Sequence, residues 1–335
     1  MRSPSCDERS ASAETQRRRR RRPHKDFFRC AALVLPYLTP TELASVSLTC
    51  KTLRQISKSI TLGRISNSSR GFETVPTPFL NPTAKANAHP YSYFLYTPTQ
   101  TLPVSPDTRQ SWGSSDGPRV EGRPDPFLFR VEGAIGCDCE TCRSGDGCPC
   151  SGECGPSCKC GSGCENRASQ GGITARLKIV RDERKGWGLY AAQSIPCGRF
   201  VCEYAGELLS TKEARRRQQM YDKQRHSAAA TASSLLVVKE HLPSGTACMR
   251  INIDATRTGN VSRYINHSCD GGNLDTVILR SSGALLPRIC FFTSRDVGED
   301  EELSFSYGDV SLNPNGQPCL CGSAACTGIL PSEHT

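Results

Sequence analysis

Short apolar runs separated by turn residues fill the second half of this 335-residue chain. The runs are rich in Val, Ile, Leu, Phe and Tyr, and Gly, Asn, Asp or Ser bound them, which is the pattern of β-strands. The predicted strands cover residues 176–181, 200–204, 235–238, 250–254, 274–279, 288–293 and 302–307. The pattern predicts a small, irregular, mainly β domain rather than a doubly wound parallel sheet.

Helical spacing appears near the N-terminus, in residues 27–60. Leu43, Val46 and Leu53 recur at helical spacing, and either Thr39 or Thr41 can cap a helix. The segment reads Leu-Pro-x-Leu-x-Pro-x-Glu-Leu and then Thr-Cys-Lys-x-Leu-Arg, which resembles the F-box, a helical module that docks on ubiquitin-ligase scaffolds. The alternative is a small helical hairpin whose apolar faces pack locally.

A second helix is predicted over residues 211–225. Ser210 and Glu213 form a capping box at its start. The helix has almost no apolar stripe, so we expect it on the surface. The Ala/Ser-rich residues 226–234 that follow are expected to be mobile.

Residues 61–130 are rich in Pro, Ser and Thr and are predicted to be a linker. Two stretches within them are too aromatic for a free linker. Residues 91–96 read Tyr-Ser-Tyr-Phe-Leu-Tyr, and residues 127–129 read Phe-Leu-Phe. We expect both stretches to lie as strands on a neighbouring domain.

Nine cysteines lie within 28 residues, at spacings C-x-C-x2-C-x5-C-x-C-x3-C-x3-C-x-C-x3-C. They are Cys137, Cys139, Cys142, Cys148, Cys150, Cys154, Cys158, Cys160 and Cys164. Zinc prefers four tetrahedral ligands, so three ions need about twelve Zn–S bonds, which nine thiolates supply when three of them bridge. The run has almost no apolar side chains, so metal must hold it folded. A disulfide-rich secreted module would need an even count and a secretory signal.

A second group, Cys319, Cys321 and Cys326, is one ligand short of a tetrahedral zinc site. Cys269 is the obvious fourth donor, and zinc would then tie the C-terminal tail to an upstream loop. The other cysteines are expected to be ordinary free thiols: Cys6, Cys30, Cys50, Cys197, Cys202, Cys248 and Cys290.

The formal net charge of +9 comes mostly from the first 30 residues, which carry ten Lys/Arg and four Asp/Glu. Thiolates bound to four zinc ions would leave the rest of the chain at about −2. Such a body suits a basic peptide substrate rather than nucleic acid. Residues 1–26 contain six consecutive arginines, residues 17–22, which indicate a nuclear-localisation or nucleic-acid-binding patch or a solubilising tail.

No apolar run reaches the roughly 18 residues that a membrane span needs. Residues 27–38 come nearest, but Arg29 and Pro36 interrupt them. The segment also lacks a small-residue cleavage site. We therefore expect an intracellular, reduced protein with no membrane partner.

Five features together resemble a SET-domain protein lysine methyltransferase with pre-SET and post-SET zinc modules. They are the nine-cysteine run, Lys-Gly-Trp-Gly-Leu-Tyr-Ala (185–191), Arg-Tyr-Ile-Asn-His-Ser-Cys (263–269), Glu-Leu-Ser-Phe-Ser-Tyr-Gly (302–308), and the final cysteine group. The match spans about residues 130–330. The nine-cysteine module points to the suppressor-of-variegation branch, and the whole chain looks like a plant SUVR-type member.

The resemblance implies a mainly β fold, the SET-domain β-clip with its pseudoknot, flanked by zinc modules and a small α-helical N-terminal segment. It implies these parts: 1–26 basic disordered tail, 27–60 F-box-like segment, 61–130 linker with an aromatic strand, 131–170 pre-SET, 171–310 SET and 315–330 post-SET. The implied cofactors are S-adenosyl-L-methionine and four zinc ions, three in pre-SET and one in post-SET.

Methyl transfer from S-adenosylmethionine requires a neutral lysine amine, although free lysine has a pKa of about 10.4. Desolvation and the nearby positive sulfonium both lower that pKa. By resemblance, Tyr307 is the catalytic tyrosine, Tyr204 is a channel wall, and Phe305 leaves room for di- or trimethylation. The resemblance also implies that the cofactor is bound by Lys185, Gly186, Trp187, Arg263, Asn266, His267 and Tyr307.

Three positions depart from the family pattern. The loop after Cys269 reads Asp-Gly-Gly-Asn, one residue longer than usual and without the proline. Residues 233–237 lack a tyrosine that usually contacts the cofactor, and Ser306 stands where Asp is common. None of these departures removes Tyr307, Asn266 or His267.

The leading hypothesis is a nuclear histone H3 lysine-9 methyltransferase that acts in chromatin silencing. The alternatives are a non-histone lysine methyltransferase and a catalytically weak, zinc-stapled chromatin-binding module. The expected partners are the histone H3 tail or nucleosome and, through residues 27–60, a ubiquitin-ligase scaffold. No direct sequence-specific DNA binding is expected.

Overall fold

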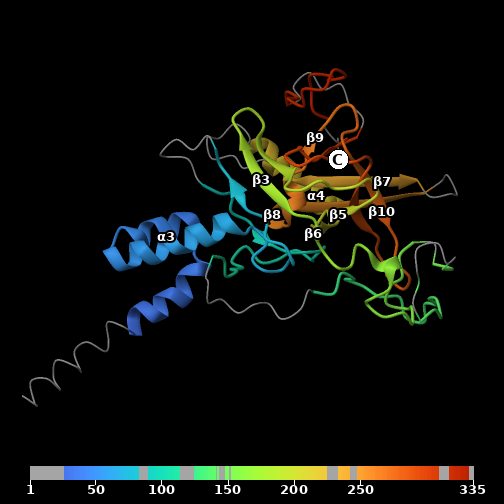
Figure 1. Cartoon of the computed structure of the whole chain (residues 1–335), viewed down its shortest axis with the longest axis horizontal. Helices are drawn as coiled ribbons and strands as arrows, with labels where there is room; N and C mark the ends of the chain where they lie inside the picture. The colour runs from blue at the N-terminus through green and yellow to red at the C-terminus, as the bar shows by residue number, and fades with distance from the viewer. Residues whose placement is uncertain are drawn as a thin grey trace, which may run out of the picture. The chain divides into compact units, whose positions relative to one another are not determined.

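The computed structural model describes residues 26–82, 90–113, 124–140, 142, 148–150, 152–224, 233–241, 247–308 and 317–331 (Figure 1). The chain divides into two compact units. Residues 1–64 and 109–118 make the first, and residues 65–108 and 119–335 make the second. The arginine run of the predicted basic tail lies outside the described residues. No described helix is long and apolar enough to cross a membrane.

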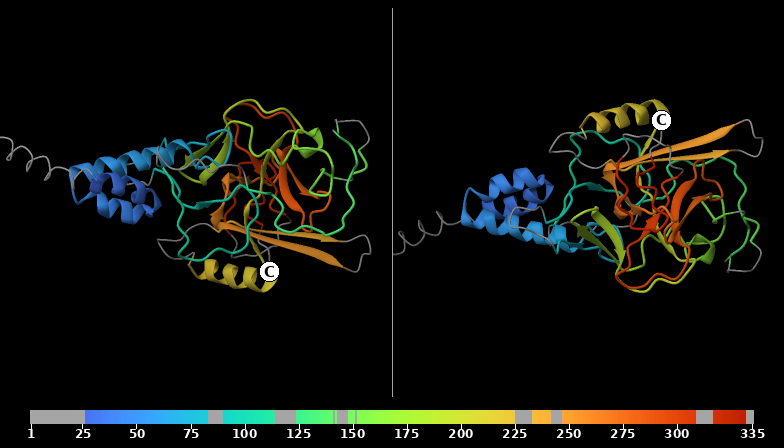
Figure 2. Two further views of the ribbon diagram at one scale, coloured as in Figure 1. Left: turned by 90° about the horizontal axis from the view of Figure 1, so that it is seen from below. Right: turned by 90° about the horizontal axis from the view of Figure 1, so that it is seen from above.

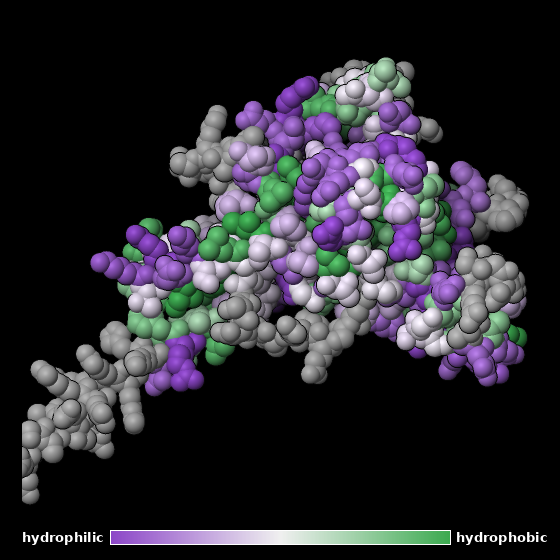
Figure 3. All heavy atoms as spheres, viewed as in Figure 1, coloured by the Kyte–Doolittle hydropathy of each residue, from purple (hydrophilic) through white to green (hydrophobic). Residues whose placement is uncertain are grey.

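The first unit is helical. Residues 26–34 form a helix, and η1 (Leu35–Tyr37), α2 (Pro40–Ser47) and α3 (Lys51–Ser66) follow. Thr39 caps α2 through a capping box with Glu42, which settles the choice between the two candidate caps. Leu35, Leu43, Leu53 and Ile60 form its buried core. Apolar and charged side chains share its surface in Figure 3, and Leu33, Val34, Leu48 and Leu62 are exposed.

A buried arginine ties residue 112 to these helices. The Arg64 guanidinium donates to the carbonyls of Trp112 at 3.0 Å, Pro36 at 3.0 Å and Leu38 at 2.7 Å. The adjoining Gly113 has φ +81°, and a Cβ there would lie 2.2 Å from the carbonyl oxygen of Ile60. Residues 112–113 therefore belong to the helical unit, which the Pro/Ser/Thr-rich composition around them did not reveal.

The second unit is mainly β, as predicted. Its strands are β1 (Phe79–Leu80), β2 (Leu95–Tyr96), β3 (Leu177–Asp182), β4 (Gly186–Ala191), β5 (Phe200–Glu203), β6 (Gly206–Leu209), β7 (Leu235–His241), β8 (Cys248–Gly259), β9 (Asn266–His267), β10 (Leu274–Leu279), β11 (Arg288–Thr293) and β12 (Ser304–Phe305). The helical elements are η2 (Glu165–Arg167), α4 (Thr211–Gln224) and η3 (Val261–Tyr264). The sheets run β1-β3-β4, β10-β11-β5, β12-β9 and β2-β8-β6, with β7 also on β8.

The predicted linker contributes strands to these sheets. β1 pairs in parallel with β3, and β2 pairs in parallel with β8. The aromatic stretch 91–96 was expected to lie as a strand, and its last two residues do so. Strands of two residues are too short to show the period-2 pattern that identifies a strand in sequence.

β4 and β6 were not predicted from the sequence, because both contain glycines, which are typical of turns. Residues 302–307 were predicted as one strand, but the strand is limited to Ser304–Phe305, with Glu302 in an isolated bridge to Tyr190. Residues 127–129 form no strand. The predicted surface helix is α4, where the amide of Glu213 donates to Ser210 Oγ at 3.3 Å. Figure 2 shows α4 beside the long β7–β8 hairpin from two sides.

The pairing of β9 with β12 places two distant motifs side by side. The strands are parallel, with Asn266 opposite Ser304 and His267 opposite Phe305. The amide of Ser268 donates to the Phe305 carbonyl at 3.0 Å. This is the interweaving expected of the SET pseudoknot, and it positions the candidate site.

Candidate active site and zinc clusters

Tyr307 follows β12 and is fixed at both ends by the β9 segment. Its hydroxyl donates to the Ile265 carbonyl at 2.7 Å, and its amide donates to His267 Nδ1 at 3.1 Å. The hydroxyl hydrogen is therefore engaged, and the lone pairs of Oη remain to accept an N–H from a substrate.

A continuous row of rings joins Tyr307 to Tyr204. The ring centroids are 4.9 Å apart for Tyr307 and Phe305, 4.7 Å for Phe305 and Phe291, and 6.3 Å for Phe291 and Tyr204. The Tyr204 hydroxyl donates to the Ser234 carbonyl at 2.7 Å. The structure thus brings the three predicted catalytic residues into one aromatic group. Phe291, which links them, was missed because an apolar β11 residue looks like ordinary core.

Burial raises the pKa of both Tyr204 and Tyr307 well above the usual range. Both phenols therefore stay protonated at neutral pH and cannot serve as general bases. A substrate amine that reacts here must lose its proton before transfer, and the aromatic surroundings favour that neutral form by desolvation.

Glu302 joins the two motifs that were predicted to bind cofactor. Its Oε2 accepts from Lys185 Nζ at 2.7 Å, and its Oε1 accepts from Asn266 Nδ2 at 2.8 Å. A Cβ at Gly188 would lie 2.9 Å from Glu302 Oε1 and 3.1 Å from Asn266 Nδ2, so a side chain there would have to displace this pair. Sequence reasoning missed Glu302, although it opens the Glu-Leu-Ser-Phe-Ser-Tyr motif.

Gly186 and Trp187 stand at the start of β4. Gly186 has φ +83° and open space where a Cβ would point, so its backbone conformation is what requires glycine. The Trp187 ring lies edge-on to Phe79, with centroids 5.4 Å apart, and its carbonyl accepts from Asn266 Nδ2 at 3.4 Å. The half-buried indole therefore packs against Phe79, and the backbone carbonyl is the part of Trp187 that contacts Asn266.

Arg263 stacks on the aromatic stretch 91–96, with Cζ 4.8 Å from the Phe94 ring centroid. Among the described residues, its Nη1 is buried and has no hydrogen-bond partner. A buried cationic donor without a partner is costly unless an anion completes it. The carboxylate of S-adenosylmethionine is such an anion, so the residues present fit the cofactor.

His267 is 6% exposed, and burial lowers the pKa of its imidazole. Nδ1 accepts from the Tyr307 amide, and Nε2 lies 3.2 Å from Cys269 Sγ. The ring therefore lies between Tyr307, the predicted catalytic tyrosine, and the predicted C-terminal zinc site.

All nine cysteines of the predicted pre-SET run gather in one cluster. The sulfurs of Cys137, Cys142 and Cys154 lie 3.6–3.7 Å apart. Ligands of one tetrahedral zinc with bonds of about 2.3 Å would be about 3.8 Å apart. Cys137 belongs to three of the four-thiol groups that could hold a metal, which is what bridging thiolates require.

The four cysteines of the second group also meet. Cys269, Cys319, Cys321 and Cys326 have their sulfurs within 4.8 Å of one another. The Cys269 and Cys319 sulfurs are 3.7 Å apart. The described cysteines form no disulfides. The donor set is all sulfur, closed and tetrahedral in number, which fits structural zinc.

The thiols of the first cluster differ in acidity. The amide of Cys150 lowers the pKa of Cys148 to about 6, while burial raises the pKa of Cys137 to about 12. A metal ion must therefore displace protons from the buried sulfurs, and binding energy at this cluster becomes folding energy.

Comparison with known proteins agrees with this geometry. Residues 186–308 match the SET domain family. The chain is 53% identical over 332 residues to histone-lysine N-methyltransferase SUVR3 of Arabidopsis thaliana, covering 92% of each chain. The chain belongs to the SET-domain histone-lysine N-methyltransferases.

The structure also resembles solved structures of two other members of this family. The solved methyltransferase domain of human SETMAR superposes with a TM-score of 0.59 at 26% identity, covering 79% of this chain and 97% of that one. Arabidopsis SUVH6 in complex with SAM gives a TM-score of 0.57 at 25% identity, covering 79% and 55%. In sequence, SUVH6, described as H3 lysine-9 specific, is 36% identical over 193 residues, or 52% of this chain and 24% of that one.

Proposed function

We propose that this enzyme methylates lysine 9 of histone H3 in the nucleus and thereby acts in chromatin silencing. The observation that carries the proposal is the aromatic row from Tyr204 to Tyr307, which ends at a phenol whose oxygen is free to accept an amine N–H. The printed specificity of SUVH6 supports lysine 9. The nearly neutral body suits the basic histone tail.

In this proposal Tyr307 orients the lysine amine, while Tyr204, Phe305 and Phe291 exclude water around it. S-adenosylmethionine supplies an electrophilic methyl group on a sulfonium. The rings favour the neutral amine by desolvation and hold its lone pair in line for transfer, which is an orientation effect. They also attract methylated ammonium products.

We assign the cofactor to the region where the start of β4 meets β9, because Asn266 Nδ2 lies 3.4 Å from the Trp187 carbonyl there. Arg263 would pair with the carboxylate of the cofactor, and Asn266 with its amine. The backbones of Lys185, Gly186, Trp187 and His267 and the side chain of Tyr307 would make the remaining contacts. Four zinc ions on the thirteen clustered cysteines, three in residues 131–170 and one in residues 315–330, would hold the modules around the SET residues 171–310.

The deciding experiment is intact-mass analysis of a histone H3 tail peptide after incubation with the zinc-loaded enzyme and S-adenosylmethionine. A matched peptide carries arginine at its ninth residue. The proposal expects methyl additions on the first peptide and none on the second. Equal methylation of both would indicate another lysine, and methylation of other proteins only would favour the non-histone alternative. Zinc and cofactor binding without turnover would favour the binding-module alternative.

Phe305→Tyr tests the room that the aromatic row leaves for methyl groups. The Phe305 ring touches both Phe291 and Tyr307, so an added hydroxyl would enter the channel. We expect the products to shift from di- or trimethyl toward monomethyl, with the first methylation slowed by less than about tenfold. Mass spectra of the product peptide measure this, and an unchanged distribution would refute the role of Phe305.

Gly188→Ala tests the assigned cofactor site. The new methyl group would displace Glu302 or Asn266, because both lie within van der Waals distance of its position. We expect the dissociation constant for S-adenosylmethionine, measured by calorimetry, to rise about tenfold or more. Gly161→Ala is the control, since a Cβ there meets nothing within 4 Å. Equal affinities in the two variants would contradict the assignment.

Docking on a ubiquitin-ligase scaffold stays a prediction for the helical unit. The exposed Leu33, Val34, Leu48 and Leu62 favour it over a hairpin that buries all its apolar faces locally. Deletion of residues 27–60 should abolish capture of a purified scaffold protein. Capture that survives this deletion would exclude the prediction.

A further inference from the structure

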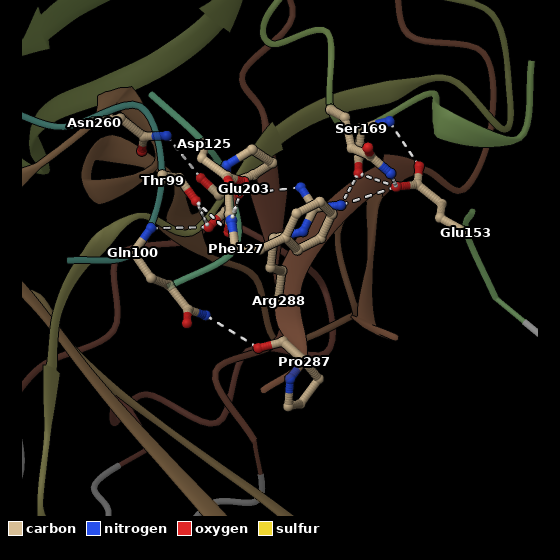
Figure 4. A network of polar contacts seen from close by, with 12 residues as sticks. Thr99, Gln100, Asp125, Phe127, Glu153, Ser169, Glu203, Asn260, Pro287 and Arg288 are labelled. Carbon is tan, nitrogen blue, oxygen red and sulfur yellow. Dashed lines mark hydrogen bonds and ion pairs between the residues drawn. The ribbon is translucent and has the colours of Figure 1, made fainter. Parts of the chain in front are cut away.

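A buried arginine lies behind the aromatic row, at the first residue of β11. Arg288 donates from Nη2 to Glu153 Oε2 at 2.9 Å and from Nη1 to Glu203 Oε2 at 3.3 Å (Figure 4). The side chains of Arg288, Glu153 and Glu203 are 3%, 7% and 0% exposed. The Arg288 guanidinium also lies over the Phe127 ring, 5.4 Å from its centroid.

The two carboxylates belong to different parts of the chain. Glu153 lies between Cys150 and Cys154, inside the nine-cysteine cluster. Its carboxylate also accepts from the Ser169 amide and hydroxyl, each at 2.7 Å. The cluster is therefore anchored to Arg288 through a carboxylate whose oxygens are all engaged.

Glu203 lies at the end of β5, directly before Tyr204. It accepts from Thr99 Oγ1 at 2.7 Å and from the Gln100 amide at 3.0 Å, as Figure 4 shows. Its carbonyl accepts from Asn260 Nδ2 at 2.8 Å. The side chain of Glu203 is thus held from three directions, and the backbone that leads to Tyr204 is held with it.

The same two strands position Tyr204 and Phe291, two of the four rings in the aromatic row. The Tyr204 amide donates to the carbonyl of Ile289, the residue after Arg288, at 2.7 Å. Two positions further along β11, Phe291 contacts both Tyr204 and Phe305. A displacement of the Arg288–Glu203 pair would therefore move both Tyr204 and Phe291.

We propose that Arg288 is a positioning residue for methyl transfer, which fixes the Tyr204 wall through Glu203 and braces it against the nine-cysteine cluster through Glu153. This rests on the proposed role of Tyr204 in the substrate channel. Arginine is required because its two nitrogens reach two separate carboxylates, which the single ammonium of lysine cannot do with the same geometry.

Arg288→Lys tests the inference while keeping the buried charge. With the H3 peptide, we expect kcat to fall about tenfold or more, because small displacements of positioned groups are expensive in rate. KM for peptide and cofactor should stay within about twofold. Zinc content, measured by mass spectrometry of the metal, should be unchanged. Unchanged kcat would overturn the proposal.

Glu153→Gln tests the same connection by removing the charge of the carboxylate that pairs with Arg288. It should lower kcat in the same way, and combining it with Arg288→Lys should add little, because both changes break one connection. Glu73→Gln is the matched control: Glu73 is 7% exposed and accepts from the Tyr96 hydroxyl at 2.8 Å and the Ile173 amide at 2.9 Å. If this control lowers kcat equally, the loss reflects general destabilisation and the proposal fails.

A readout without turnover separates this inference from the proposed function. Arg288→Lys should speed hydrogen exchange at the Tyr204 amide relative to the native enzyme, while Glu73→Gln should leave it unchanged. This comparison holds even where the H3 peptide proves to be the wrong substrate. Equal exchange at Tyr204 in the native enzyme and Arg288→Lys would contradict the positioning role.

Discussion

Replacing Tyr307 with phenylalanine is expected to lower kcat by about 10²–10³-fold, with little change in KM for the peptide. The hydroxyl hydrogen is held by the Ile265 carbonyl, so Oη presents its lone pairs to the substrate. Removing that oxygen leaves the amine without an acceptor while the ring still fills the channel. Intact-mass time courses on the H3 peptide measure the rate.

Tyr221→Phe is the matched control for this result. It also removes a hydroxyl, which donates to Asp254 Oδ2 at 2.7 Å, but α4 carries it outside the aromatic row. We expect its kcat to stay within about threefold of the native value, as for most substitutions away from the chemistry. If Tyr307→Phe were no slower than Tyr221→Phe, Tyr307 would not be the catalytic tyrosine.

Cys137→Ser is expected to remove the zinc of the whole nine-cysteine cluster and with it most of the activity. Cys137 is 2% exposed and is shared by three of the possible four-thiol groups. A structural zinc contributes roughly 10–16 kcal/mol of folding free energy, and this run has no apolar core to replace it. Bound zinc should fall from the proposed four ions to about one per chain.

Cys197→Ser provides the comparison for that loss. Cys197 is exposed and lies outside both thiol clusters. Its zinc content and kcat should match those of the native enzyme. A Cys137→Ser protein with native zinc content would contradict the bridged cluster, and one with native kcat would show that the cluster is dispensable for catalysis.

Much of the candidate site could be predicted from the sequence, because its residues belong to motifs that are short and continuous along the chain. The cysteine spacings and the Asn-His and Phe-Ser-Tyr motifs each concentrate functional residues within a few positions. The β9–β12 pairing then brings Asn266, His267 and Tyr307 together, as the resemblance implied. The choice of Cys269 as fourth ligand also agrees with the sulfur positions.

The residues that could not be identified from the sequence depend on contacts with residues that are distant along the chain. Phe291, Glu302 and Arg288 look like ordinary strand residues, and only the folded chain brings their side chains to Tyr204, Asn266 and Glu153. Residues 79–80 and 95–96 pair for only two residues, which leaves no period to detect. Trp112 joins the helical unit through the buried Arg64, a contact across 48 residues that no local pattern encodes.

A crystal structure of the zinc-loaded enzyme with S-adenosylhomocysteine and an H3 tail peptide tests the assigned active site most directly. We expect the ninth-residue amine to lie within about 3 Å of Tyr307 Oη, between Tyr204 and Phe305. We also expect the cofactor carboxylate to bind Arg263. A lysine bound away from the aromatic row, or a cofactor that leaves Arg263 and Asn266 untouched, would contradict this assignment.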